Sequence, residues 1–204
     1  HDALPISQRY WDARQDFVFI TEAGDFSWCW QRARNSSVKP VFLSDAGDNP
    51  TAGGAGDVVA TLAELLSQEE VAAAKVSVIY ASVPDATALA LMQNAGVGQC
   101  VSVSLGAKLD PRHSAPLELT GEVRCLIDGA DPQGVLRCGG VDIIVSARRR
   151  PYHLRSDFLA LGLDPLMSDV TIVKIGYLEP ELKAMAQAHW LRSEERRVGK
   201  ECLR

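Results

Sequence analysis

The chain has 204 residues, of which 47% are apolar and 23% are charged, a composition typical of an ordinary globular domain. Its formal net charge is −5, which disfavours a nucleic-acid binder because such proteins normally present a basic surface. No apolar run approaches the roughly 20 residues that a membrane-spanning helix needs. Composition and charge therefore predict a protein whose partners include no nucleic acid and no membrane.

The two ends differ from the rest of the chain. Residues 1–7 (HDALPIS) and 192–204 (RSEERRVGKECLR) resemble translated sequencing-adapter strings, and neither carries a periodic apolar pattern. We expect both segments to be artefactual and to contribute nothing to the fold. Residues 8–191 are then the expected domain.

Between these ends lie four cysteines: Cys29, Cys100, Cys125 and Cys138. None forms the closely spaced pair that zinc sites and redox motifs require. Cys100 and Cys125 stand in apolar, strand-like runs, where a free thiol behaves as a small hydrophobic group. Reduced cysteines are typical of a cytoplasmic protein, which is the location we expect.

Apolar runs and helical patterns alternate along the chain. Strands are expected at residues 17–20, 41–44, 76–80, 100–105, 117–127 and 170–175, with a hairpin over 134–145. Helices are expected at 25–34, 58–66, 84–94, 156–161 and 179–191. This alternation predicts an α/β fold with a mostly parallel sheet flanked by helices. The segment 100–146 is richer in strand and is expected to form an antiparallel insertion.

The most distinctive segment is SDAGDNPTAGGAGD at residues 44–57, which lies between a predicted strand and a predicted helix. A loop in that place sits at the carboxyl edge of the sheet, where open α/β folds bind their ligands. Its glycines allow a ligand to approach the backbone closely, and its acids favour a metal, an amine or a hydroxyl-rich partner. The candidate site residues here are Asp45, Asp48, Asn49, Thr51, Gly53, Gly54, Gly56 and Asp57.

This loop does not match the known nucleotide-binding patterns. The phosphate-binding loop of nucleotide hydrolases ends in Gly-Lys-Ser/Thr, whereas Gly56 is followed by Asp57. The dinucleotide pattern needs a glycine where this chain has Val59. A purely structural interpretation also stays open, because Asp, Asn, Pro and Gly are turn formers and Asp57 could simply cap a helix.

Two basic positions add to the candidate site. Lys174 stands near the end of a predicted buried strand, so it must reach water or a carboxylate. It could hold the loop by pairing with Asp45 or Asp48, contact a substrate, or extend its amine to solvent. Arg149, within Arg148-Arg149-Arg150, suits carboxylate recognition, although a solvated charge run is the alternative.

The segment DNPTAGGAGD at residues 48–57 resembles the signature of the MlrC-like (microcystinase C-type) metallopeptidase family. The resemblance continues through 94–98 (NAGVG), 105–108 (LGAK), 162–165 (GLDP) and 173–177 (VKIGY). It covers roughly residues 16–190 and implies that this chain is most of the family's C-terminal domain. The resemblance also lends Arg149 some weight, since the family tends to carry a basic residue there.

The resemblance implies a zinc-dependent peptidase or amidohydrolase that acts on linear peptides, with the zinc ligands in an N-terminal domain outside this chain. The present domain would complete the cleft and be inactive alone, and its catalytic residues stay unknown. The sequence has no His-Glu-x-x-His motif, and His113, His153 and His189 are widely spaced. In the full-length protein, Asp48→Ala is expected to lower activity far more than stability.

Whether the chain itself belongs to an enzyme stays open at this point. A non-catalytic domain built on the same loop is the alternative. Its loop would either bind a small ligand or dock the N-terminal domain.

Overall fold

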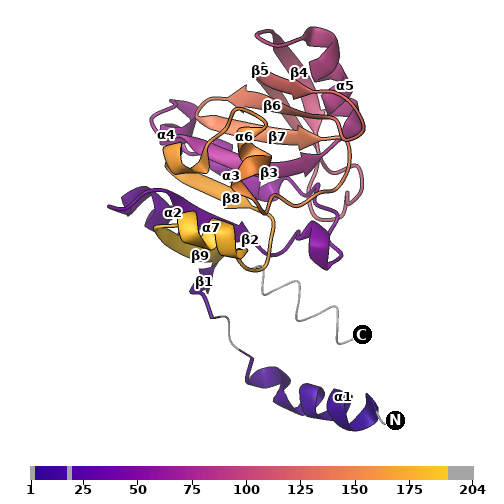
Figure 1. The fold of residues 1–204 in the computed structure, drawn as a ribbon, viewed down its shortest axis with the longest axis vertical. Helices are drawn as coiled ribbons and strands as arrows, with labels where there is room; N and C mark the ends of the chain where they lie inside the picture. Colours follow the sequence, from indigo (N-terminus) through magenta and orange to yellow (C-terminus); the bar gives the residue numbers. More distant parts are fainter. Residues whose placement is uncertain (1–2, 18–19, 193–204) are drawn as a thin grey trace.

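The computed structural model describes residues 3–17 and 20–192. In this part of the chain the strands form one nine-stranded sheet in the order β1-β9-β2-β8-β3-β7-β6-β5-β4. Helices pack on both of its faces (Figure 1). The predicted class, an α/β fold with a mostly parallel sheet and an antiparallel stretch, is confirmed.

Six strands make up the parallel part of the sheet. Their bounds are β1 (Ala23–Gly24), β9 (Ala188–Arg192), β2 (Val41–Asp45), β8 (Val170–Val173), β3 (Val78–Pro84) and β7 (Val141–Ser146). Each pairs in parallel with its neighbour. All six therefore end at the same edge, which we call the carboxyl edge. β2, β8, β3 and β7 are buried throughout, as expected for strands covered on both faces.

The other three strands are antiparallel. They are β6 (Gln133–Cys138), β5 (Leu117–Ile127) and β4 (Cys100–Leu105). The expected hairpin around Gly139-Gly140 joins β6 to β7, and β5 pairs with both β6 and β4. The predicted antiparallel insertion over 100–146 is thus present and continues the same sheet.

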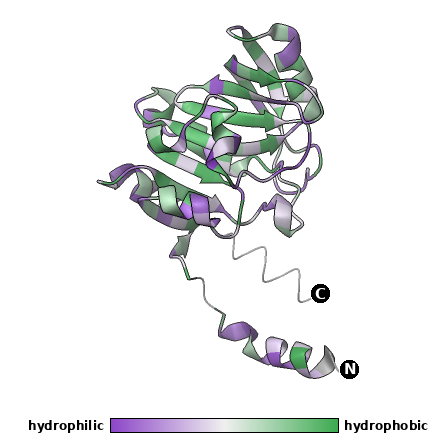
Figure 2. Ribbon diagram, in the orientation of Figure 1, coloured by the Kyte–Doolittle hydropathy of each residue, from purple (hydrophilic) through white to green (hydrophobic). Residues whose placement is uncertain are grey.

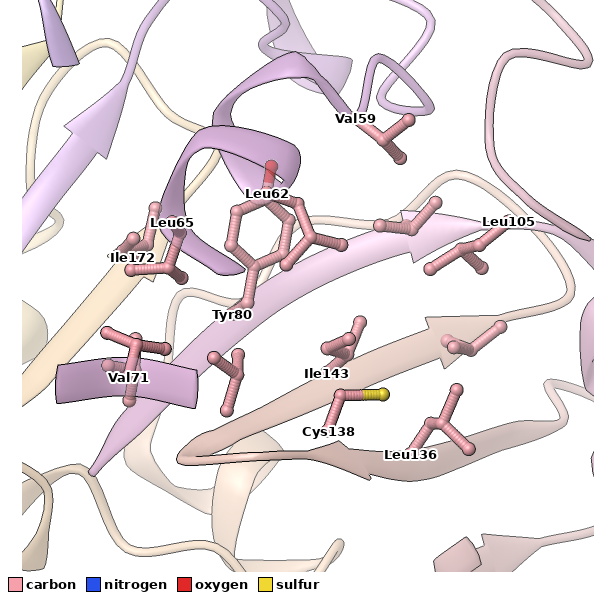
Figure 3. Packing of buried hydrophobic residues seen from close by; sticks show 14 of the residues in the cluster. Val59, Leu62, Leu65, Val71, Tyr80, Leu105, Leu136, Cys138, Ile143 and Ile172 are labelled. Carbon is pink, nitrogen blue, oxygen red and sulfur yellow. The ribbon is translucent and has the colours of Figure 1, made fainter. Parts of the chain in front are cut away.

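The alternation of side chains along the strands divides the core into two clusters. One face packs against α2 (Phe26–Asn35), α3 (Ala60–Leu66), α4 (Glu69–Ala72) and α5 (Ala86–Ala95). The other packs against α6 (Arg155–Leu159) and α7 (Pro180–Met185). Figure 2 shows the apolar strands between these layers, and Figure 3 shows Tyr80 packed beneath α3. The remaining helical segments are α1 (Ala3–Asp12), η1 (Ala13–Gln15), η2 (Pro50–Ala52) and η3 (Pro165–Met167).

Local capping explains where two of the helices start. Asp25 accepts a hydrogen bond from the Trp28 amide at the start of α2, and Asp85 accepts hydrogen bonds from the amides of Thr87 and Ala88 at the start of α5. Such side-chain acceptors satisfy amides that have no partner within the helix. Gly96, at φ 86°, follows the end of α5. No helix in the described ranges is both long and apolar enough to cross a membrane.

The predicted helix over 179–191 is wrong in its second half. α7 ends at Met185, and residues 188–192 form β9, which pairs in parallel with β2 from Val41↔Ala188 to Asp45↔Arg192. Leu182 and Met185 do pack as helical residues, but the outer side of β2 needs a hydrogen-bonding partner. The chain supplies that partner by extending after Met185, which local periodicity does not reveal.

The ends of the expected domain also differ from the structure. α1 begins inside the segment 1–7 and lies apart from the sheet (Figure 1). Residues 17 and 20 are not in a strand, residues 18–19 lie outside the described residues, and the edge strand is β1. Arg192, expected in the artefactual tail, is the last residue of β9 and is 7% exposed.

His189 on β9 makes one partly buried polar contact. Its Nε2 lies 2.7 Å from the Ser44 hydroxyl oxygen on β2. Burial, and to a smaller extent the positive charge of Lys183, lowers the pKa of His189 from 6.5 to about 4. The ring is therefore neutral in the folded chain near neutral pH.

This depressed pKa makes stability depend on pH. The unfolded chain takes up a proton at His189 as pH falls below 6.5, whereas the folded chain resists it until about pH 4. The free energy of unfolding should therefore fall over that window, by about 1–2 kcal/mol because the ring is only partly buried. Chemical denaturation of wild type and His189→Gln between pH 7 and 4 measures this. His153→Gln is the control, and an unchanged slope in His189→Gln would contradict the prediction.

Candidate functional site

The loop after β2 lies at the carboxyl edge of the sheet, as the sequence predicts. β8 is the parallel neighbour of β2, with Leu43 opposite Ile172 and Ser44 opposite Val173. Lys174 directly follows β8 and therefore emerges at the same edge. Its Nζ lies 3.0 Å from Asp48 Oδ2, which is one of the pairings that the sequence left open.

Asp48 and Lys174 form a buried ion pair whose hydrogen bonds are satisfied. Asp48 is 5% exposed and Lys174 is 3% exposed. The Asp48 carboxylate also accepts hydrogen bonds from the amides of Gly56 and Val58, at 2.7 and 2.8 Å. Lys174 donates to the same two residues through their carbonyl oxygens as well as to Asp48. The ion pair therefore joins the start of the loop, at Asp48, to its end, at Gly56 and Val58.

This geometry decides between the interpretations of Lys174. An ammonium group has three hydrogens to donate, and Lys174 directs them at Asp48 and the two carbonyl oxygens. Lys174 therefore holds the loop and has no hydrogen left for a substrate. The expectation that Asp48→Ala would largely spare stability is also revised, because removing this carboxylate would leave a buried ammonium uncompensated.

The turn within the loop is built by Asn49. Its side-chain oxygen accepts hydrogen bonds from the Thr51 amide and hydroxyl, at 2.9 and 2.7 Å. Its carbonyl oxygen accepts from the Gly54 amide, at 2.8 Å. Gly53 adopts φ 91°, a left-handed conformation in which glycine is unstrained. Thr51 and Gly53 are exposed at the tip, whereas Asn49 is buried.

Asp45 is held separately from Lys174. Its carboxylate accepts hydrogen bonds from the Thr61 hydroxyl, at 2.7 Å, and from Arg192 Nη1, at 3.0 Å. The accepting carboxylate is buried inside the fold, since Asp45 is 2% exposed. Asp45 therefore anchors the start of the loop to α3 and to the end of β9.

Asp57 connects the loop to a second loop, residues 106–114, that follows β4. Its fully buried carboxylate accepts hydrogen bonds from the amides of Leu109 and Asp110, and its carbonyl oxygen accepts from the Ala107 amide. The interpretation of Asp57 as a simple helix cap is therefore wrong. Asp85 adds a further link, because its carboxylate accepts from the Gly106 amide at 2.9 Å.

The outward surface of the two loops carries different residues. A hollow of about 340 Å³ is lined by Gly53, Ala55, Leu109, Asp110, Arg112 and Arg149. Arg149 Nη1 donates to the Gly54 carbonyl oxygen at 2.9 Å, which ties the arginine to the glycine-rich loop. The structure therefore places Arg149 beside Gly53 and Gly54, as the candidate site requires.

Sequence reasoning did not single out the 106–114 loop as part of the site. There Asp110 pairs with His113 Nδ1 at 2.5 Å and with Arg112 Nε at 3.3 Å. Partial burial raises the pKa of Asp110, but hydrogen bonds from His113 and Arg112 outweigh that effect and hold the pKa below its ordinary value. The available signal was the glycine in Leu105-Gly-Ala-Lys108, which marks a sharp turn. His153 instead lines a different hollow, of about 780 Å³, beside α6 and α7.

A metal centre does not arise from these residues. Within residues 3–17 and 20–192, no group of three or more His, Cys, Asp or Glu side chains is arranged to hold a metal ion. The carboxylates of Asp48 and Asp57 are occupied by backbone amides instead. The described residues therefore do not fit a catalytic zinc ion, and no chemical step can be assigned to one here.

Fold and loop together define an α/β domain that presents a rigid, loop-built surface at the carboxyl edge of its sheet. Residues 43–194 match the family described as MlrC C-terminus. Because this match covers most of the chain, the protein belongs to that family. The family expectation from the sequence is thereby confirmed.

Known proteins that resemble this chain include a curated relative and a solved structure. Microcystinase C from Sphingomonas sp. is 29% identical over 153 residues, which cover 70% of this chain and 29% of the relative. A solved structure from Mesorhizobium sp. BNC1, named a "putative metallopeptidase", matches with a TM-score of 0.75 at 21% identity, over 92% of this chain and 39% of that one. The chain thus spans less than half the length of either protein, and the second likeness shows the fold alone.

Breaking the buried ion pair should be costly. Lys174→Met leaves Asp48 without its counter-ion, and we expect the free energy of unfolding to fall by about 3–5 kcal/mol. Lys75→Met, at an exposed lysine, is the control and should change it by less than about 0.5 kcal/mol. Combining Lys174→Met with Asp48→Asn should cost less than the two separate losses together. Urea denaturation of wild type, the three single variants and the double variant measures these losses; a loss below about 1 kcal/mol for Lys174→Met would count against this role.

The contact between the two loops depends on Gly106. At its φ of +74°, a Cβ would lie 2.4 Å from Val59 Cγ1 and 2.6 Å from the Asp57 carbonyl oxygen. Gly98 has a similar φ of +83° but open space around it, so Gly98→Ala measures the conformational strain alone, about 1 kcal/mol. Gly106→Ala should destabilise by about 2–3 kcal/mol more, from overpacking. Equal melting temperatures for the two variants would disprove the steric argument.

Proposed function

We propose that this chain is the C-terminal, cleft-completing domain of a zinc-dependent peptidase or amidohydrolase that acts on linear peptides. The observation that carries the proposal is the division of roles at the carboxyl edge. Buried charges, Asp48 with Lys174 and Asp57 with the second loop, fix the backbone. The exposed residues above them, among them Thr51 and Arg149, remain available to a ligand.

Support for a peptidase comes from the relative named microcystinase C. The solved structure named a "putative metallopeptidase" supports the fold, and both proteins are much longer than this chain. In the proposal, the N-terminal domain supplies the zinc ligands, and the rigid loop surface of the present domain closes the opposite side of the cleft. The domain is inactive alone, because a catalytic zinc site needs protein ligands and an open position for water.

The proposed location is the cytoplasm. All four cysteines in the described part of the chain, Cys29, Cys100, Cys125 and Cys138, are free thiols. Free thiols, two of them buried, are typical of proteins in a reducing compartment.

A second candidate function is docking or ligand binding without chemistry. It is favoured by the complete use of Asp48, Asp57 and Lys174 in internal contacts, which leaves those charges no catalytic role. Arg149→Ala in the full-length protein separates the two candidates. A change in kcat or KM supports a place in the cleft, whereas a weaker association of the two domains with unchanged kinetics supports docking.

Restoring the full-length gene tests the main proposal. The full-length protein should hydrolyse a linear peptide, lose that activity with a chelator and regain it with zinc. The present chain should show no hydrolysis and should carry no stoichiometric zinc after purification without an affinity tag, as measured by mass spectrometry of metals. Hydrolysis by this chain alone would refute its role as an incomplete part of the enzyme.

A further inference from the structure

The hollow between the two loops is bounded by two arginines from distant parts of the chain. Arg112 belongs to the loop after β4, and Arg149 follows β7. Gly53, Ala55 and Leu109 supply side walls without charge. The buried contacts of Asp57 fix the spacing of the two loops, and with it the width of the hollow.

The charges around the hollow favour an anion. Asp110 is the acidic residue among those that line it, and its carboxylate is already engaged by His113, Arg112 and the Arg112 amide. Arg149 has no acidic partner among the described residues, since its contact is the Gly54 carbonyl oxygen. The hollow therefore retains about one uncompensated positive charge.

The guanidinium groups also keep donors for a ligand. Among the described residues, Arg112 uses Nε and Arg149 uses Nη1. The other N–H groups of both side chains have no protein acceptor there. A planar guanidinium with a free pair of N–H groups matches the two oxygens of a carboxylate.

We propose that this hollow binds a carboxylate group of a peptide ligand, held by Arg149 and Arg112. The peptide nature of the ligand rests on the function proposed above. At about 340 Å³, the hollow is at the small end of ligand pockets, so it takes the end or one side chain of a peptide. A single net positive charge suits a monoanionic carboxylate better than a dianionic phosphate, which would also meet Asp110.

The test uses the present chain and two matched probes. N-acetyl-glycyl-glycine ends in a free carboxylate, and N-acetyl-glycyl-glycinamide carries a neutral amide in its place. We expect the acid to shift the backbone amide resonances of Gly53, Gly54, Leu109 and Asp110 saturably at millimolar concentration. The amide probe should leave them unchanged.

Three substitutions sharpen the result. Arg149→Gln and Arg112→Gln should each weaken binding of the acid about tenfold, the effect of losing one charge-assisted hydrogen bond. Two variants are needed because Arg149→Gln also removes the contact to Gly54. Arg148→Gln is the matched control, since Arg148 is exposed and does not line the hollow. Unchanged resonances of the strands verify that each variant is folded.

The proposal is overturned if both probes bind equally, if neither gives a saturable shift, or if the shifts map to other residues. It is also overturned if inorganic phosphate binds more tightly than the acid at pH 7. None of these outcomes depends on hydrolysis. Failure here with an active full-length enzyme removes only the carboxylate site, whereas binding by this chain without activity in the full-length protein removes only the peptidase.

Discussion

The buried contact between Lys174 and Asp48 is the constraint on which the candidate site depends. Two opposite charges that are almost fully removed from water are tolerable only when they meet each other and further hydrogen-bonding groups. Lys174 directly follows β8, and Asp48 lies in the loop after β2. The backbone amides of Gly56 and Val58 donate to Asp48, and their carbonyl oxygens accept from Lys174. The glycine-rich loop therefore has one position relative to the sheet.

A second buried acidic residue, Asp57, connects the glycine-rich loop to the loop after β4. Asp57 binds amides of the loop after β4, and Asp85 binds the Gly106 amide in the same loop. The antiparallel strands are thus tied to the parallel part by more than sheet pairing. Exposed side chains carried on a fixed backbone suit a binding surface, because a preformed geometry lowers the entropy lost on association.

The composition of the loop and its geometry suggest different roles for its acidic residues. The acids of this loop favour a metal, an amine or a hydroxyl-rich partner, yet the carboxylates of Asp48 and Asp57 accept hydrogen bonds from backbone amides. The charged groups that line the hollow include Arg149, which the sequence analysis named, and Arg112, which it did not. In the proposed two-domain enzyme, the N-terminal domain carries out the chemistry. This domain forms the opposite side of the cleft and supplies its positive charge.

The sequence by itself determined the α/β class, the antiparallel stretch over 100–146 and the place of the glycine-rich loop. These features follow from local propensity and from period, which a short window of residues contains. Only the tertiary structure decided that residues 188–192 form a strand beside β2 and that Lys174 binds Asp48, 126 positions away, while Asp45 binds Arg192. It alone brought Arg112 to Arg149. Such pairings depend on strand order and register, which are set by the burial and hydrogen bonding of the whole sheet.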